Sequence, residues 1–173
     1  MSSENRTSVP NSLNEHWMPF TSNKDFKANP RLITEAKGVY LKTHHGKTQI
    51  DASSGLFCNP LGHGRKEITE AVTKQLDTLD YAQPFQQGFG GSFELASKIA
   101  KHTPGDLNKM FFTICGSTAV ETAIKIAVAY HRAKGDAQRF RFVGRERGYH
   151  GMNIGCVSVG GMVNNVKTFA SIL

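Results

Sequence analysis

The four residues Cys115-Gly116-Ser117-Thr118 have the composition of an anion-binding turn. They follow the apolar run 110–114 and precede a helical pattern. A chain that turns sharply from a strand into a helix points its first helical N–H groups, and the positive end of the helix dipole, at one place. Gly116 allows close backbone approach, and the two hydroxyl groups add donors. We therefore expect this junction to bind a phosphate group, with an ordinary capped helix as the alternative.

A second glycine-rich loop, 144–151, carries Tyr149 and His150 and follows the apolar run 139–143. Open α/β sheets bind their ligands at the carboxyl ends of strands. An aromatic ring there can lie on a planar ligand, or Tyr149 can pack on its own loop. The spacings of the Walker phosphate loop and of the GxGxxG dinucleotide motif are absent. The two loops suit a flat phosphorylated cofactor better than a nucleotide, and a flavin mononucleotide fits the same outline.

The elements that must position these loops form a strand–helix–strand pattern. Apolar residues recur at helical spacing over 118–134. Thr118 and Glu121 have the spacing of a capping box, which predicts a helix start at Thr118, and Gly135 predicts its end. The two flanking apolar runs read as buried strands of a parallel sheet. The pattern predicts a βαβ unit with a right-handed crossover, and an α/β fold class.

The remaining chain alternates short elements with loops that are rich in glycine, asparagine and proline. The expected elements are a β-hairpin at 39–51 turning at Gly46, a loop at 53–64, a helix at 65–79, a loop at 81–91, and a short helix that Ser92 caps and residues 103–105 stop. Either loop can line a binding site or serve as a connector.

Composition limits the function classes. The 173 residues include 21 Lys and Arg against 14 Asp and Glu, a net charge of +7 with histidine neutral. The basic residues are dispersed, which disfavours nucleic-acid binding. The three cysteines form no CxxC pair, so neither a disulfide framework nor a metal site is expected. The absence of a long apolar run or a signal-peptide core predicts a cytoplasmic protein with no membrane partner.

The sequence resembles the class III aminotransferases, which are fold-type I pyridoxal-phosphate enzymes. The resemblance rests on FFTICGSTAVETAIKIAVAYHRAKG and VGRERGYHGMN. HWMPFTSNKDFKANPRLI, SSGLFCNPLGHGRKEI and TLDYAQPFQQG are similar to one branch, the ω-amino-acid (β-alanine):pyruvate aminotransferases. The resemblance runs from about Asn14 onwards. It implies ping-pong amino transfer from an amine such as β-alanine to pyruvate, with the cofactor as electron sink and a lysine as Schiff-base partner.

The resemblance also implies roles for individual residues. Gly116 and Ser117 would hold the cofactor phosphate with Thr118 beside them, and Tyr149 would stack on the pyridine ring, with His150 and Gly151 completing that loop. Trp17, Phe20 and Phe57 would line the substrate pocket, Phe57 standing where relatives usually have Trp. Phe85 would belong to a loop that reaches across a homodimer to the neighbouring site.

Two departures from the family qualify these implications. Relatives read SGSE where this chain has Thr118 in place of the acid, which puts the local charge in doubt. No lysine stands in the context of the Schiff-base lysine, so we expect an inactive N-terminal fragment. The expected domains are an arm at 1–13, a small-domain segment at 14–64 and part of the large cofactor domain at 65–173. The alternative function is a non-catalytic phosphate- or cofactor-binding module that acts with a partner chain.

Overall fold

The computed structural model describes residues 9–173, which form two compact units that divide between Gln87 and Gly88. Part of the expected arm, residues 1–8, lies outside the described residues. The domain boundaries expected at 13 and 64 refer to the longer family fold and stay predictions. The first unit comprises the described residues 9–87, and the second unit comprises residues 88–173.

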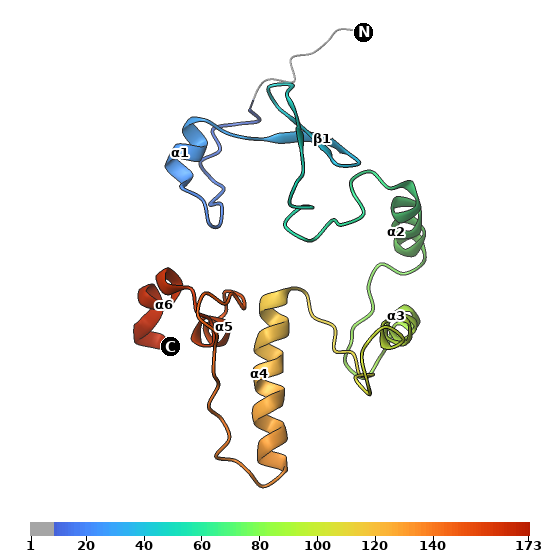
Figure 1. Cartoon of the computed structure of the whole chain (residues 1–173). Helices are drawn as coiled ribbons and strands as arrows, with labels where there is room; N and C mark the ends of the chain where they lie inside the picture. The colour runs from blue at the N-terminus through green and yellow to red at the C-terminus, as the bar shows by residue number, and fades with distance from the viewer. Residues whose placement is uncertain (1–8) are drawn as a thin grey trace. The chain divides into compact units, whose positions relative to one another are not determined.

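The first unit contains an antiparallel sheet in the order β1-β2-β3 (Figure 1). Its strands are β1 (Ile33–Lys37), β2 (Tyr40–Thr43) and β3 (Thr48–Ile50). β2 and β3 pair with Tyr40 opposite Ile50, and the turn between them contains Gly46 at φ +78°. The expected hairpin is therefore confirmed. β1 was not predicted, because every side chain of this strand is exposed and its pattern lacks apolar alternation.

Two helices complete the first unit, α1 (Asn23–Ala28) and α2 (Lys66–Thr78). α2 confirms the helix expected at 65–79. α1 was not predicted, and it is anchored by the buried side chain of Phe26. The Asn23 amide closes the turn before α1, because its oxygen accepts from the Met18 N–H at 2.9 Å and its nitrogen donates to the Met18 carbonyl at 2.9 Å.

The second unit is helical. Its elements are α3 (Gly90–Ala100), α4 (Gly116–Ala133), α5 (Ile154–Ser158), α6 (Val163–Phe169) and a 3-10 turn η1 (Ala170–Ile172). After α4 the chain turns and runs back toward the start of α4, where α5 lies beside it (Figure 1). The buried apolar residues of this unit are Cys156 and Val157, both on α5. The core therefore sits where α5 meets α4.

The expected end of α4 is confirmed. Gly135 has φ +82°, its N–H donates to the Arg132 carbonyl, and the Asp136 N–H donates to the His131 carbonyl. These two bonds form the Schellman motif, which satisfies carbonyl groups at a helix end and favours glycine. Ser92, by contrast, lies inside α3, which begins at Gly90, and its hydroxyl donates to the Phe89 carbonyl. The expected Ser92 cap is therefore wrong.

The capping box expected at Thr118 and Glu121 is also wrong. α4 begins at Gly116, with Cys115 as its N-cap and no side-chain cap hydrogen bond. The Thr118 hydroxyl lies 3.3 Å from the Cys115 Sγ, and the Glu121 carboxylate accepts from the Cys156 thiol at 3.7 Å. A tertiary partner on α5 thus replaces the local one that the spacing predicted.

Residues 110–114 and 139–143 are not strands, which corrects the expected βαβ unit. The only sheet among the described residues is β1-β2-β3. Ile114 and Val143 are 95% and 98% exposed. A strand needs a neighbour for its backbone hydrogen bonds, and a parallel strand needs cover on both faces. Neither run has such a neighbour in the described part of the chain, so its apolar sequence alone does not make it a strand.

The described residues 9–173 contain neither a membrane-spanning helix nor a cluster of metal-binding side chains. No helix there is long and apolar enough to cross a membrane. No group of three or more His, Cys, Asp or Glu side chains is placed to hold a metal ion.

Gly62 supports a testable prediction for the first unit. It has φ +81°, and a Cβ there would lie 2.9 Å from the Gly38 carbonyl oxygen. Gly46 has φ +78° with nothing within 4 Å of such an atom. In urea unfolding, we expect Gly46→Ala to lose about 1–2 kcal/mol from backbone strain alone. Gly62→Ala should lose about 1–3 kcal/mol more, because the methyl group also overpacks against backbone. Equal losses would contradict the close approach.

Candidate functional site

The start of α4 presents backbone donors that no side chain caps. Cys115, the N-cap residue, is extended at φ −162°, and the first turn of the helix contains no acidic residue. The leading N–H groups of a helix have no intrahelical acceptors. A Cβ built on Gly116 would meet nothing within 4 Å. The first turn of α4 is therefore open to an anion, and the helix dipole favours negative charge there.

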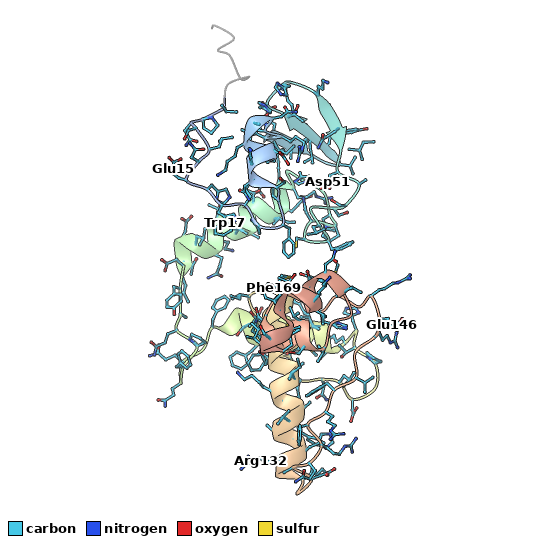
Figure 2. The ribbon with its side chains drawn as sticks, turned by 90° about the vertical axis from the view of Figure 1, so that its left-hand side faces the viewer. Glu15, Trp17, Asp51, Arg132, Glu146 and Phe169 are labelled. Atoms are coloured by element: carbon cyan, nitrogen blue, oxygen red, sulfur yellow. The ribbon has the colours of Figure 1, made fainter. Side chains whose placement is uncertain are left out.

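The loop 144–151 returns to this helix start. Figure 2 marks the path with Arg132, near the C-terminal end of α4, and Glu146, on the returning loop. The Met152 N–H donates to the Ser117 Oγ at 3.0 Å. Gly151 has φ +116°, and a Cβ there would lie 2.7 Å from the Ser117 Cα. Only glycine fits this approach without displacing backbone, and Ser117 keeps its own hydroxyl proton free to donate to a ligand.

Backbone hydrogen bonds hold the loop in place. The Arg147 N–H donates to the Gly161 carbonyl at 3.0 Å, and the Gly161 N–H donates to the Gly148 carbonyl at 2.8 Å. On α5, the buried Cys156 thiol shares its single proton between the Ser117 carbonyl at 3.2 Å and the Glu121 carboxylate at 3.7 Å. The segment 156–161, which follows the loop, is therefore hydrogen-bonded both to the loop and to the start of α4. The glycine pair Gly160-Gly161 was a signal for such close packing that the sequence analysis did not use.

A pocket of about 350 Å³ lies between the helix start and the loop. It is lined by Cys115, Gly116, Ser117, Val120, Tyr149, His150 and Gly151. The structure therefore brings together five of the six residues predicted to bind a cofactor. Thr118 lies outside this lining with its hydroxyl on Cys115. Cys115 and Val120 also line the pocket and were not predicted, although Cys115 directly precedes Gly116.

Two thiols near the pocket have opposite electrostatic environments. The hydrogen bond from the Thr118 hydroxyl, helped by the Thr118 N–H, lowers the pKa of the exposed Cys115 thiol. Burial, followed by the negative charge of Glu121, raises the pKa of the Cys156 thiol. Cys115 therefore has the greater thiolate character, and Cys156 remains a neutral hydrogen-bond donor.

The four aromatic residues with expected roles in substrate binding belong to the first unit. Trp17 and Phe57 are 87% and 84% exposed, and Phe20 and Phe85 are also exposed (Figure 2 labels Trp17). Phe20 and Phe57 have positive φ values of 50° and 70°. This region costs an L-residue about 1–2 kcal/mol, and it clusters at functional sites. The backbone at Phe20 and Phe57 is therefore strained.

Comparison with known proteins assigns the family. The family model described as aminotransferase class-III matches residues 21–172. The chain belongs to the class III aminotransferases. It is 47% identical over 163 residues to an omega-aminotransferase of Caulobacter vibrioides, which covers 94% of this chain and 37% of that protein. It is 50% identical over 157 residues to the omega-amino acid–pyruvate aminotransferase of Pseudomonas putida, which covers 91% of this chain and 35% of that protein.

Solved structures of transaminases also match this chain over part of their length. The omega transaminase of Pseudomonas jessenii, a complex with PMP, matches with a TM-score of 0.88 at 29% identity, covering 94% of this chain and 37% of that one. Class III aminotransferases depend on pyridoxal phosphate, and the expected α/β, fold-type I class is confirmed. The chain spans about a third of the length of the relatives it matches.

The two thiols of this class III chain give a second testable prediction. Because the thiolate is the reactive form, a lowered pKa increases reactivity near neutral pH. We expect iodoacetamide to modify Cys115 well before Cys156, with the half-point of the Cys115 rate–pH profile below the ordinary thiol value of 9.0 and that of Cys156 above it. Thr118→Val should move the Cys115 profile to higher pH. Peptide mass spectrometry separates the sites, and superimposable profiles would refute the assignment.

Proposed function

We propose that this chain is part of an ω-amino-acid:pyruvate aminotransferase, an enzyme that moves an amino group from a terminal amine such as β-alanine to pyruvate, and that the chain alone is inactive. The observation that carries the proposal is the pocket at the start of α4, which gathers Gly116, Ser117, Tyr149, His150 and Gly151. The similarity to the beta-alanine–pyruvate aminotransferase of Pseudomonas aeruginosa, 48% identical over 161 residues, supports the substrate pair.

The residues at the helix start fit the phosphate of pyridoxal phosphate. The uncapped N–H groups of Gly116 and Ser117 offer charge-assisted hydrogen bonds, and the first turn brings no competing carboxylate. The Ser117 Oγ already accepts from Met152, so its proton is the one left to donate to a phosphate oxygen. The open space at Gly116 permits the close backbone approach that such bonds need.

The returning loop fits the ring of the same cofactor. Tyr149 is exposed and lines the pocket beside His150 and Gly151, so its ring can cover one face of a pyridine. The backbone bonds between this loop and Gly161 hold Tyr149 in register with the helix start. When bound, the cofactor supplies an electron sink for carbanion chemistry. The residues of this chain bind its phosphate, orient its ring and keep water from one face.

The aromatic residues of the first unit are the proposed substrate contacts. Trp17, Phe20 and Phe57 would form an apolar wall for the carbon chain of the amine, and Phe85 would reach the neighbouring site of a homodimer. One solved neighbour is an omega transaminase variant engineered for the synthesis of bulky amines, and a tryptophan and a phenylalanine are among its replaced residues, which supports aromatic control of substrate size. A cytoplasmic location remains part of the proposal.

Cofactor binding gives a third testable prediction. Pyridoxamine phosphate is the suitable probe, because its amine does not react with surface lysines. In equilibrium dialysis, we expect it to bind more tightly than pyridoxamine, and Ser117→Ala to weaken it about tenfold or more, since a hydrogen bond to a charged group contributes about 1.5–3 kcal/mol. Ser158→Ala, on the exposed side of α5, is the matched control and should change nothing. Equal binding with and without the phosphate group would defeat the proposal.

Amino transfer gives a fourth testable prediction. No lysine lines the pocket, so the isolated chain should form no alanine from β-alanine and pyruvate. A chimera that joins this chain to the part of the Pseudomonas putida enzyme beyond the matched region should form alanine. The same chimera with Ser117→Ala should lose activity, and a higher concentration of cofactor should restore it. A folded chimera that binds pyridoxamine phosphate but forms no alanine would count against this function.

A further inference from the structure

The carboxylate of Asp51 organises the loop that follows β3 (Figure 2). Its Oδ2 accepts from the Gly55 N–H at 2.8 Å. Its Oδ1 accepts from the Ser53 Oγ at 3.1 Å and from the Ser53 N–H at 3.3 Å. The side chain is only 7% exposed. Asp51 therefore satisfies the backbone donors at the entrance to the 51–63 loop.

His63 closes the other end of the same loop. Its Nε2 lies 3.0 Å from the Asp51 Oδ2, and its Nδ1 lies 2.9 Å from the Asn59 Nδ2. An amide nitrogen only donates, which assigns the ring proton to Nε2, so that Nε2–H donates to the carboxylate. Both ring nitrogens are therefore engaged. The nearby Cys58 thiol donates to the Leu56 carbonyl at 3.6 Å and not to the His63 ring.

The backbone of His63 is attached to the sheet. Its N–H donates to the Gly38 carbonyl at 2.8 Å, and its carbonyl accepts from the Gly38 N–H at 2.9 Å. The Asp51 N–H donates to the Val39 carbonyl at 2.8 Å. The two ends of the loop are thus fixed to the same β1–β2 turn, and the Asp51–His63 contact lies between them.

The loop contains a left-handed turn. Ser54, Gly55, Leu56 and Phe57 have φ values of 51°, 59°, 56° and 70°. The Phe57 N–H donates to the Ser53 carbonyl at 2.9 Å, and the Asn59 N–H donates to the Ser54 carbonyl at 2.8 Å. L-residues disfavour this conformation, and it persists only where the surroundings impose it. The side chains of Leu56 and Phe57 are exposed, so they form no packed core that would impose this conformation.

We propose that Asp51 and His63 are positioning residues, which close the 51–63 loop, hold the left-handed turn 54–57 and thereby set the direction of Phe57 toward the amine substrate. The substrate part rests on the proposed function, in which Phe57 contacts the carbon chain of the amine. We call the Asp51–His63 contact that closes the 51–63 loop the clamp. The evidence for the clamp consists only of contacts within the first unit. Asp51 and His63 touch no substrate; they act through Phe57.

The experiment measures the motion of the turn through the fluorescence of a single tryptophan in each chain. The native chain has a single tryptophan, Trp17, in the same unit. The Trp17→Phe/Phe57→Trp chain moves that reporter to the turn. Both chains are then made with each of three substitutions, Asp51→Asn, Asp51→Ala and His63→Gln. The matched control is Glu67→Gln, because Glu67 is an exposed acid that pairs with Arg65. Far-UV circular dichroism checks folding, and the two milder variants remain informative if Asp51→Ala unfolds.

We expect anisotropy decay to show about twofold more nanosecond motion of the indole at position 57 in the clamp variants, because a released loop moves on this timescale. The Trp17 signal and the Glu67→Gln chains should not change. No change at position 57, or an equal change at both positions, would overturn the clamp. This arm uses no cofactor or substrate, so it is independent of the proposed function.

A kinetic arm tests the substrate part. In the alanine-forming chimera, Asp51→Asn should raise KM for β-alanine several-fold with little change in kcat, because it displaces Phe57 and leaves the α4 pocket intact. A fall in kcat with KM unchanged would overturn the positioning role. If the chimera binds pyridoxamine phosphate yet forms no alanine, the proposed function fails and takes the substrate part with it, while the anisotropy result still decides the clamp.

Discussion

The contact between Ser117 and the Gly151–Met152 backbone is the constraint on which the second unit depends. It joins the start of α4 to a loop more than thirty residues later in the chain. The approach is so close that a Cβ at Gly151 would overlap Ser117. Cys156 secures the junction from α5 by its bond to the Ser117 carbonyl. Without this contact, the helix start and Tyr149 would be two separate surface features and would not form one pocket.

In the first unit, polar side chains restrain a backbone segment that is unfavourable by itself. A left-handed turn in L-residues has no local reason to persist, and the exposed side chains of Leu56 and Phe57 provide no packing to stabilise it. Asp51 and His63 supply the missing restraint through hydrogen bonds to the turn and to each other. In both units, a strained or glycine-dependent backbone therefore lies next to residues with proposed binding roles.

Sequence reasoning succeeded where the physical cause is local. Apolar spacing predicted α2 and most of α4, and Gly135 predicted the end of α4 because only a residue tolerant of positive φ completes that motif. It failed where a distant partner decides. Glu121 bonds to Cys156 on α5 instead of capping its own helix. The runs 110–114 and 139–143 have strand-like composition, yet a strand exists only with a paired neighbour.

The sequence by itself determined the class III family and identified five of the residues that line the pocket, because motif residues and their spacing are local properties of the chain. The tertiary structure decided which of them converge. It placed Cys115 and Val120 in the lining and turned Thr118 toward Cys115. It also revealed the Asp51–His63 contact, because a hydrogen bond between residues at the two ends of a loop depends on how the loop closes, which no local pattern encodes.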